Sequence, residues 1–516
     1  MFVDARTLPP KFIIDADVCI VGAGAAGITL ARDLCGGTRK IALLESGNFD
    51  FDADTQKLYA GEVVGHAYTP LDRDRLRYLG GTTNHWQGSC RPFDALDLAD
   101  WPFGVDELAP FYRQADDICQ LSSHTFEPMD WSSEEARPLE LGEGASLKNG
   151  VFLYSPPTRF GTAYRNDLAA AAGLTVYLNA NLLQIDTDDA GTGVSGLQVA
   201  CLNGNRGRAR ARFYVLAAGG IENARLLLNA DQVQKSGLGN QYDLVGRYFM
   251  DHPFVPLAAT IVAHAASPQM RFYDHHVVRG QIIEGYLSAS DEVRRKEKLP
   301  PFAIGIRPAG VNVNEGVGNL RLPPALRNMM SENIANRLTY YLPRLLNRME
   351  TPVTWINDRL WLNPPGAYTT VYTCGADPDP ASRVTLTNTL DALGMRETRL
   401  DWRLPADLER NMHRAHELLA QELGRSGTGR LRIESSATTG YDPMEDLGEG
   451  HHHMGTTRMH DDPRRGVVDA DSRVHGIGNL FIAGSSVFPS YACDDPTMTI
   501  VALALRLSSH LKSALG

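Results

Sequence analysis

The chain has 516 residues, of which 43% are hydrophobic and 22% are charged, a composition typical of a globular protein rather than a disordered one. Its length exceeds the ~250–300 residues at which a single hydrophobic core stops growing, so we expect more than one domain. Acidic residues (61) outnumber basic residues (50), and no stretch concentrates lysine and arginine. Nucleic acids and acidic membranes are therefore not expected partners.

The seven cysteines are scattered without CxxC pairs or metal-ligand spacing, and an odd number cannot all pair within one chain. Free thiols indicate a reducing compartment. The first ten residues lack the apolar region of a signal peptide, and no run of 18 apolar residues follows. We therefore expect a cytoplasmic protein without a membrane partner.

The first elements in chain order form a βαβ unit over residues 16–47. An apolar run is followed by the turn Gly22-Ala-Gly24-Ala-Ala-Gly27, an amphipathic stretch and a second apolar run that ends at Glu45. Glycines at this spacing allow a tight turn, close approach of the backbone to a pyrophosphate, and packing of the helix on the strand. A carboxylate at the end of the second strand can accept hydrogen bonds from ribose hydroxyls. The unit predicts dinucleotide binding.

Residues 61–128 are mostly irregular, with one helix near 105–121, and long loops of this kind usually wrap a ligand. We expect a flavin loop and cap segment over about 61–160. Strands are predicted at 174–187 and 194–202, and 211–228 predicts a strand, a turn and a helix. Between 253 and 428 strands mix with helices at 325–347 and 406–424. The last segment returns to turn, strand and helix. The pattern predicts an α/β protein with residues 1–252 and 429–516 in one domain and 253–428 inserted.

Several separated motifs resemble those of the glucose-methanol-choline (GMC) oxidoreductases. They are GAGAAG with Glu45, the loop GGTTNHW at 80–86, VLAAGGIENARLLL at 215–228, VGRYFMDHP at 245–253, DPDPASRVTLTN at 377–388, and HHHMGTTRM, NLFIAGSSVFPS and DPTMTIVALALR in the last 66 residues. The resemblance implies a Rossmann-like FAD-binding domain built from both chain ends and an inserted α+β substrate domain, a sheet covered by helices. It implies FAD, and not NAD, as the cofactor.

The same resemblance implies which residues hold the FAD. The adenine and ribose would be held by the N-terminal unit and by the strand near Leu182, and Gly484 and Ser485 would approach the pyrophosphate and the ribityl chain. The isoalloxazine would lie under the loop at 80–86 and the C-terminal segment. The implied cofactor-binding residues are Gly22, Gly24, Gly27, Glu45, Gly81, Thr82, Asn84, His85, Leu182, Ala218, Gly484, Ser485, Thr497 and Met498.

His452 is the candidate general base, because the family has a histidine three residues before the glycine of a Gly-Thr step, here Gly455-Thr456. Imidazole suits the removal of a hydroxyl proton while a hydride passes to flavin N5, since its ordinary pKa lies near working pH. The run His451-His452-His453 also raises the alternatives of a histidine-rich turn or a metal site. Adjacent residues of an extended run point to opposite sides, so we expect no metal.

Asp495 stands where the family usually has asparagine or histidine, and it is the second candidate catalytic residue. Its carboxylate could raise the pKa of His452 by ion pairing, or burial could keep the carboxyl itself protonated. A third interpretation is that Asp495 only caps the helix that follows.

His85 has two open interpretations. His85-Trp86 is similar to the Thr-His-Trp segment of pyranose oxidases, in which the histidine is bonded covalently to the flavin, but noncovalent relatives also carry His-Trp here. We expect the noncovalent form.

The sequence therefore predicts an FAD-dependent oxidoreductase that oxidises a hydroxyl of a sugar, a glycoside or another alcohol, with oxygen or another electron acceptor. Two alternatives stay open at this point. One is lyase or decarboxylase chemistry on the same scaffold, and the other is a flavin-bound protein without catalytic activity.

Overall fold

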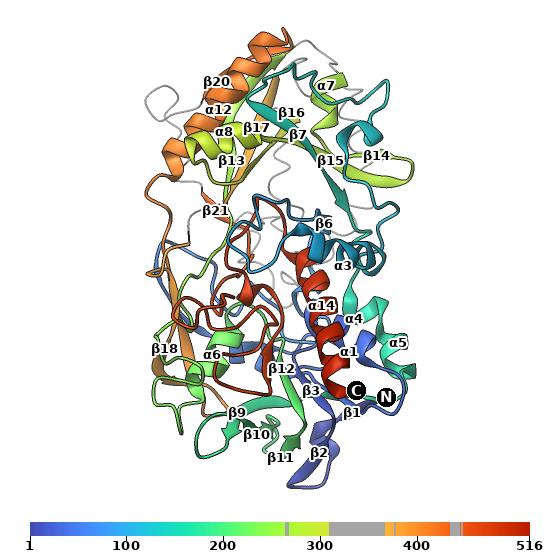
Figure 1. Ribbon diagram of the computed structural model, residues 1–516, viewed down its shortest axis with the longest axis vertical. Helices are drawn as coiled ribbons and strands as arrows, with labels where there is room; N and C mark the ends of the chain where they lie inside the picture. The colour runs from blue at the N-terminus through green and yellow to red at the C-terminus, as the bar shows by residue number, and fades with distance from the viewer. Residues whose placement is uncertain (264–267, 309–366, 376–377, 434–443, 445–446) are drawn as a thin grey trace, which may run out of the picture.

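The computed structural model describes residues 1–516 except 264–267, 309–366, 376–377, 434–443 and 445–446. Figure 1 shows the described residues as two sheet regions stacked along the long axis. A parallel sheet with both chain termini lies at one end, and a larger sheet lies at the other.

The parallel sheet has six strands in the order β1-β8-β4-β3-β12-β22. Their bounds are Phe2–Asp4 (β1), Leu174–Leu178 (β8), Ile41–Leu44 (β4), Val18–Val21 (β3), Phe213–Leu216 (β12) and Leu480–Ile482 (β22). All neighbouring pairs are parallel, which needs crossover connections and buries both faces. Two covering helices, α1 (Ala25–Leu34) and α14 (Thr497–Leu515), pack against each other. The sheet takes strands from both ends of the chain, which confirms the predicted fold class.

Two smaller sheets flank this region. One has the order β2-β11-β10-β9, with bounds Phe12–Asp15, Arg206–Arg210, Val194–Ala200 and Asn181–Thr187. The other has the order β18-β19-β5, with bounds Arg383–Leu390, Arg396–Trp402 and Gly61–Gly65. The strands predicted at 174–187 and 194–202 are thus confirmed as β8, β9 and β10.

Among the described residues the largest sheet has nine strands, with the path β20-β13-β17-β16-β15-β7-β6 and with β14 and β21 at its sides. Their bounds are Gly429–Ile433, Pro253–Ala263, Ala367–Cys374, Phe302–Pro308, Gln281–Ala289, Leu147–Tyr154 and Ser89–Cys90, then His276–Val278 (β14) and Gly448–Glu449 (β21). The helix α12 (Leu408–Arg425) packs on this sheet and confirms the helix predicted at 406–424. The helices α7 (Pro268–Phe272) and α8 (Asp291–Glu297) lie beside the sheet (Figure 1).

The other helices belong to the loops and crossovers. Their bounds are Ala53–Gln56 (α2), Val105–Ile118 (α3), Phe160–Ala163 (α4), Arg165–Ala170 (α5) and Glu222–Asn229 (α6). Short 3₁₀ turns cover Ala5–Thr7 (η1), Lys57–Tyr59 (η2), Gly81–Asn84 (η3), Pro128–Trp131 (η4) and Ser485–Val487 (η6). The helix α6 follows β12 as predicted for 211–228.

The proposed domain boundaries at 252 and 428 stay a prediction. The largest sheet takes β6 and β7 from before this range and β20 and β21 from after it. The helix predicted at 325–347 lies outside the described residues. Among the described helices, none has the length and apolarity that a membrane crossing requires.

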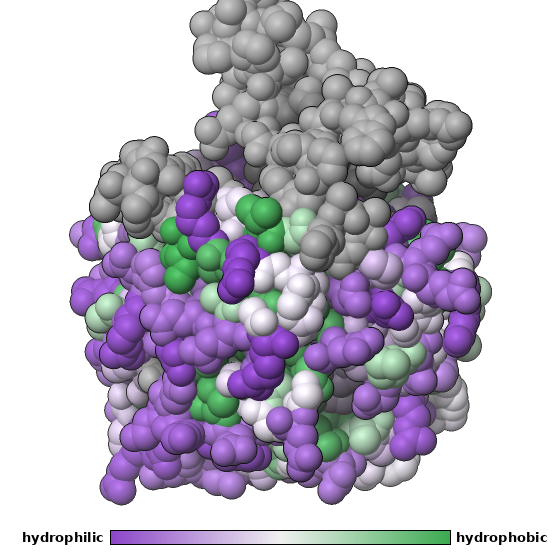
Figure 2. Space-filling model, turned by 90° about the horizontal axis from the view of Figure 1, so that it is seen from above, coloured by the Kyte–Doolittle hydropathy of each residue, from purple (hydrophilic) through white to green (hydrophobic). Residues whose placement is uncertain are grey.

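The surface in Figure 2 is mostly hydrophilic where residues are described, with smaller hydrophobic groups between polar ones. This distribution is ordinary for the outer surface of a globular protein.

Candidate active site

The turn after β3 requires glycine at two positions for packing reasons. At Gly22 the backbone φ is 104°, and a Cβ there would lie 2.6 Å from the carbonyl oxygen of Ala217. A Cβ on Gly27 would lie 1.8 Å from the carbonyl oxygen of Gly22. Gly24 is different, because no atom lies within 4 Å of its Cβ position although it is the N-cap of α1. A ligand can approach the backbone there.

Two further turns at neighbouring strand ends have the same open geometry. Gly219 follows β12 and Gly484 follows β22, with φ of 90° and 108°, and no atom lies within 4 Å of either Cβ position. Because β3, β12 and β22 are adjacent and parallel, the open positions of Gly24, Gly219 and Gly484 follow the same edge of one sheet. This edge, with the amino end of α1, fits the extended pyrophosphate and ribityl chain of FAD.

Glu45 lies at the end of β4, beside the glycine turn, and is buried. Its two carboxylate oxygens accept hydrogen bonds from the backbone N–H groups of Ala23 (3.0 Å) and Gly47 (2.8 Å). Burial raises the pKa of the carboxyl, and the two N–H groups oppose that shift. Each oxygen keeps a further lone pair, so Glu45 can still accept from a ribose hydroxyl.

The loop at 80–86 lies on the glycine turn. Gly80 donates its N–H to the carbonyl oxygen of Ala23 at 2.8 Å, and a Cβ on Gly81 would lie 3.2 Å from Cα of Gly24. Asn84 is buried, and its amide donates to the carbonyl oxygens of Leu79 and Gly81, both at 3.0 Å. Its side chain therefore shapes the loop.

The other residues assigned to the cofactor lie at four places. Thr82 and His85 are exposed on the loop at 80–86, and Leu182 is a buried residue of β9. Ala218, in the turn after β12, donates its N–H to the side-chain oxygen of Asn223 at 2.9 Å.

The C-terminal segment supplies the rest of this set. Ser485 follows Gly484, and its hydroxyl donates to the carbonyl oxygen of His453 at 2.6 Å. Thr497 is the first residue of α14 and Met498, the second, is completely buried. The structure thus brings the glycine turns, Glu45 and Ser485 to one sheet edge, and the roles of all fourteen residues stay proposals.

The histidine run lies in a bulge between two chain segments. Met250 and Met454 exchange backbone hydrogen bonds of 3.0 Å, and Pro253 pairs with Glu449. Between these pairs the carboxylate of Asp251 accepts the backbone N–H groups of His452 (2.8 Å) and His451 (3.1 Å). A buried carboxylate therefore satisfies the backbone donors that a bulge leaves unpaired.

The side chain of His452 contacts one residue through each ring nitrogen. Its Nδ1 lies 2.8 Å from Nδ1 of the buried His252, and its Nε2 lies 3.3 Å from a carboxyl oxygen of Asp495. Burial lowers the pKa of His452 to about 4, against the opposing charge of Asp251. The imidazole is therefore neutral at neutral pH.

The neighbouring histidines differ from His452. His451 is exposed, with φ of 58°, in the left-handed region. His453 is buried, and its Nε2 lies 3.0 Å from the carboxylate of Asp74. Among the described residues no group of three or more His, Cys, Asp or Glu is arranged to hold a metal ion.

Asp495 is half-buried beside His452. Burial raises the pKa of its carboxyl to about 7, and the negative charge of Glu284 adds to this shift. The interpretation that Asp495 caps the last helix is wrong, since the N-cap of α14 is Pro496 and no side chain caps it. The structure favours the protonated carboxyl over the ion pair, because a His452 with a pKa near 4 carries no charge at neutral pH.

Glu284 belongs to a polar cluster on the largest sheet. The hydroxyl of Tyr154 (β7) donates to its carboxylate, and Arg307 (β16) forms an ion pair with it, both at 2.5 Å. Burial is the largest single influence and raises the pKa of Glu284, but Arg307, His275 and Tyr154 together outweigh it, so the pKa falls to about 2. On the same sheet, Phe152 and Tyr286 pack against Cys493, two residues before Asp495. This face of the sheet therefore borders the segment that contains Cys493 and Asp495.

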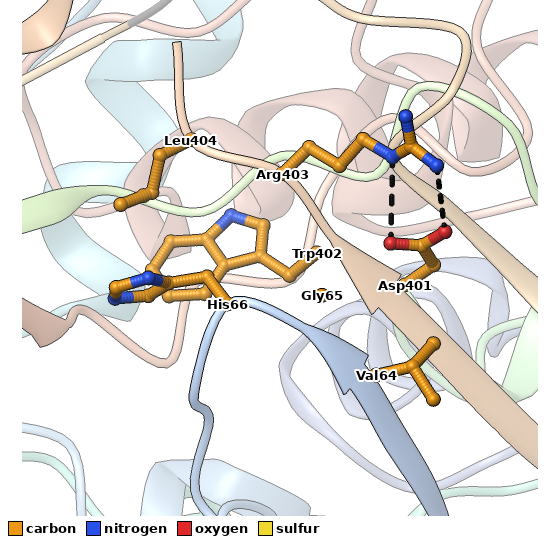
Figure 3. A pocket seen from close by; sticks show the side chains of 7 residues that line it. All are labelled: Val64, Gly65, His66, Asp401, Trp402, Arg403 and Leu404. Carbon is orange, nitrogen blue, oxygen red and sulfur yellow. Dashed lines mark hydrogen bonds and ion pairs between the residues drawn. The ribbon is translucent and has the colours of Figure 1, made fainter. Parts of the chain in front are cut away.

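Figure 3 shows a separate surface hollow of about 520 Å³ where β5 and β19 end. It is lined by Val64, Gly65, His66, Asp401, Trp402, Arg403 and Leu404, and Arg403 pairs with Asp401 across its rim. Trp402 packs edge-on against Tyr68 with ring centroids 5.0 Å apart, and the hydroxyl of Tyr68 donates to Asp251. Aromatic side chains thus separate this hollow from the histidine bulge.

Several residues of the site had no role assigned from the sequence, and Gly219 at the sheet edge is one of them. Asp251 and His252 belong to the motif at 245–253, whose polar Asp-His step after an apolar run was the available signal. Glu284 and Tyr68 stand in no recognisable motif, and only the pairing of distant strands and loops brings them near the bulge.

Two family models match the chain. Residues 17–245 match the model described as FAD dependent oxidoreductase, and residues 378–504 match the model described as GMC oxidoreductase. Among curated proteins, the chain is 24% identical to 2-methyl-1,2-propanediol dehydrogenase of Mycolicibacterium austroafricanum over 96% of this chain and 95% of that protein. It is 25% identical to 6'''-hydroxyparomomycin C oxidase of Streptomyces lividus, over 97% of this chain and 92% of that protein.

The fold also matches a solved structure along nearly its whole length. The crystal structure of a formate oxidase superposes with a TM-score of 0.61 at 16% identity, covering 98% of this chain and 99% of the other. At this low sequence identity, the match is evidence for a shared fold alone. The likeness supports the arrangement of a parallel cofactor sheet beside a second large sheet.

Proposed function

Since the chain belongs to the GMC family of FAD-dependent oxidoreductases, we propose that it oxidises a hydroxyl group to a carbonyl with His452 as the general base. The observation that carries this proposal is the distance of 3.3 Å between the side chain of His452, in the histidine bulge, and that of Asp495. The bulge lies beside the turn of Gly484, because Gly455 donates its N–H to the carbonyl oxygen of Ser485 at 3.1 Å. A base must reach the hydroxyl proton while the carbon is held near the cofactor.

FAD fits the chain because three open glycine positions follow the edge of the parallel sheet where its backbone would be held. Gly24, Gly219 and Gly484 would lie along the pyrophosphate and ribityl chain, and Glu45 would accept ribose hydroxyls. When bound, FAD supplies an acceptor for the hydride of the substrate carbon. The residues of the chain handle the proton.

His452 is the proton acceptor because its imidazole is neutral and its Nε2 faces Asp495. A substrate hydroxyl between the two side chains would donate to Nε2 of His452 and accept from the protonated carboxyl of Asp495. As the proton moves to His452, the negative charge of the nearby Asp251 stabilises the imidazolium that forms. A general base of this kind contributes a rate factor of ~10²–10⁴.

Asp495 acts in this proposal as a neutral acid. A carboxyl with a pKa of about 7 keeps its proton through the lower neutral range and can donate a hydrogen bond, as an asparagine amide does. It therefore holds the substrate oxygen without adding a negative charge where the hydride is accepted. Above pH 7 the carboxyl ionises and this donor is lost.

We infer that the substrate is a polyhydroxylated molecule, a sugar or glycoside, in preference to a simple alcohol. The names of two relatives specify hydroxyl-bearing compounds, 2-methyl-1,2-propanediol for one and 6'''-hydroxyparomomycin C for the other. The charged residues Glu284 and Arg307 on the sheet that borders Cys493 favour a polar substrate over an apolar one. Oxygen or another electron acceptor would reoxidise the cofactor. The cytoplasmic location of the protein stays a prediction.

Anaerobic mixing of the purified protein with sugars, glycosides and aryl alcohols tests this function. Bleaching of the visible flavin band by one hydroxyl compound, with recovery on admission of oxygen or an artificial acceptor, is the expected result. Consumption of a substrate without bleaching would instead favour lyase or decarboxylase chemistry. A protein that keeps its colour with the whole panel would contradict hydroxyl oxidation.

A further inference from the structure

His252 lies on the opposite side of His452 from Asp495. It is the last residue before β13, it is buried, and its ring stands nearly perpendicular to the ring of His452, at 83° with centroids 5.0 Å apart. Each of its ring nitrogens lies within hydrogen-bond distance of a partner. Nε2 is 2.8 Å from the carbonyl oxygen of Ala492, and Nδ1 is 2.8 Å from Nδ1 of His452. These two contacts determine where the protons are.

The contact with Ala492 determines the tautomer of His252. A carbonyl oxygen can only accept a hydrogen bond, so Nε2 of His252 carries a proton. Burial and the neighbouring His452 lower the pKa of His252 to about 3, so the ring carries only that one proton. Its Nδ1 is therefore a bare acceptor.

The contact between the two histidines then determines the tautomer of His452. Two nitrogens 2.8 Å apart need one proton between them, because two bare lone pairs at this distance repel each other. Since Nδ1 of His252 is bare, the proton belongs to Nδ1 of His452. A neutral imidazole has one proton, so Nε2 of His452, the nitrogen that faces Asp495, is bare.

We propose that His252 is a positioning residue that holds His452 in the Nδ1–H tautomer and so aims its basic nitrogen at the substrate. The backbone of Ala492 begins this chain of hydrogen bonds, and Ala492 lies in the same segment as Asp495. One segment thus holds the donor for the substrate oxygen and, through His252, sets the orientation of the base. This inference rests on the proposed role of His452.

The arrangement also assists the proton transfer. When Nε2 of His452 takes a proton, the ring becomes an imidazolium and its Nδ1–H becomes a stronger donor. His252 accepts that hydrogen bond without itself carrying a charge. The backbone of His452 stays fixed meanwhile by the carboxylate of Asp251.

Asparagine and glutamine at position 252 separate the tautomer role from a packing role. Asparagine places an amide oxygen near the position of Nδ1, so His252→Asn keeps the acceptor for His452. Glutamine reaches the position of Nε2, so His252→Gln keeps the donor to Ala492 and more of the side-chain volume. If His252 only packs, His252→Gln should keep more activity than His252→Asn. If His252 sets the tautomer of His452, His252→Asn should keep more activity.

The experiment combines a spectroscopic and a kinetic measurement on the FAD-loaded protein. Nitrogen-15 NMR of histidine-labelled protein, with the His452 signals assigned by their loss in His452→Ala, reports the tautomer directly. We expect the Nδ1–H form in the wild type and in His252→Asn, and loss of that form in His252→Gln. We also expect kcat/KM to fall about 10- to 100-fold in His252→Gln and to stay within about threefold in His252→Asn, with KM little changed.

An Nε2–H tautomer of His452 in the wild type would overturn the inference, as would equal kcat/KM values in the two variants. If both variants fail to fold, the tautomer of the wild type still decides. If His452→Ala keeps full activity, the proposed function fails, while the NMR result stands by itself. The two failures are therefore distinguishable.

Discussion

The edge of the parallel sheet at which β3, β12 and β22 end, here called the cofactor edge, and the histidine bulge depend on different kinds of atoms in the chain. Along the edge of the parallel sheet, Gly24, Gly219 and Gly484 matter because they have no side chain. At the histidine bulge, by contrast, the proposed roles of His452, His252 and Asp495 depend on side-chain atoms that lie 2.8 to 3.3 Å apart. The proposed cofactor contacts thus rely on the backbone and the proposed chemistry on side chains. An added side chain should therefore disrupt the sheet edge, whereas removal of a side chain should disrupt the bulge.

The largest effect is expected where a side chain is added at the cofactor edge. Gly24→Val places methyl groups where the backbone must approach a pyrophosphate, so we expect colourless, inactive protein. Gly104→Val is the matched control, because Gly104 is also a helix N-cap with negative φ and an open Cβ position, at α3. The visible spectrum of each purified variant measures the bound FAD. Full colour in Gly24→Val would show that the phosphate site lies elsewhere.

The second effect comes from removing the base in the bulge. His452→Ala should lower kcat/KM by ~10²–10⁴ while the protein keeps its FAD, since the cofactor edge is unchanged. His451→Asn is the control, because His451 is exposed and asparagine tolerates its left-handed backbone. Steady-state kinetics give kcat/KM for both variants, and the flavin content of each variant is measured in parallel. Equal losses in both variants would contradict the assignment of the base to His452.

A smaller effect is expected at Asp495, and it depends on pH. Burial raises the pKa of this carboxyl to about 7, so the donating, protonated form is present below pH 7 and is lost as the pH rises. The wild type should therefore lose kcat/KM on the alkaline side, about tenfold at pH 8 relative to its maximum. Asp495→Asn keeps a donor that does not titrate, so its activity should persist above pH 8. If kcat/KM falls at the same high pH in the wild type and in Asp495→Asn, a group other than Asp495 causes that fall.

The acid side of the same profile tests His452. Because burial lowers the pKa of the imidazole to about 4, the base stays unprotonated down to that pH and activity should fall only as the pH approaches 4. Profiles of kcat/KM from pH 4 to 9 contain both limbs. A loss of activity already centred near pH 6.5 would mean that His452 is less shielded from water than its surroundings indicate.

The smallest effect concerns the attachment of the cofactor at the exposed His85. We expect acid precipitation of the wild type to leave the yellow colour in the supernatant, because the loop glycines and Asn84 already hold the loop on the glycine turn without a covalent bond. Colour in the wild-type pellet that disappears in His85→Ala would identify a covalent bond and its residue. Either result leaves the general base unaffected.

The fold and the cofactor edge could be predicted from the sequence because their signals are local. Gly22, Gly24 and Gly27 act within one turn, and the alternation of apolar runs and amphipathic stretches predicted β3, α1 and β4 directly. His452 was predicted as the base from the family resemblance, by its spacing to Gly455. The strand pairing in the largest sheet was harder to predict from the sequence, because β7 pairs with β15 across more than a hundred residues and no local pattern specifies that register.

The sequence therefore allowed a prediction of the family, the cofactor and His452 as the base, since each motif behind these predictions consists of residues close together in the chain. The protonation states of the site depend on the tertiary structure. His252 lies 200 residues from His452, and Glu284 lies more than 200 residues from Asp495, yet the first determines the tautomer of the base and the second helps raise the pKa of the acid. Proton positions depend on burial and on charges within a few ångströms, and folding alone brings these groups together.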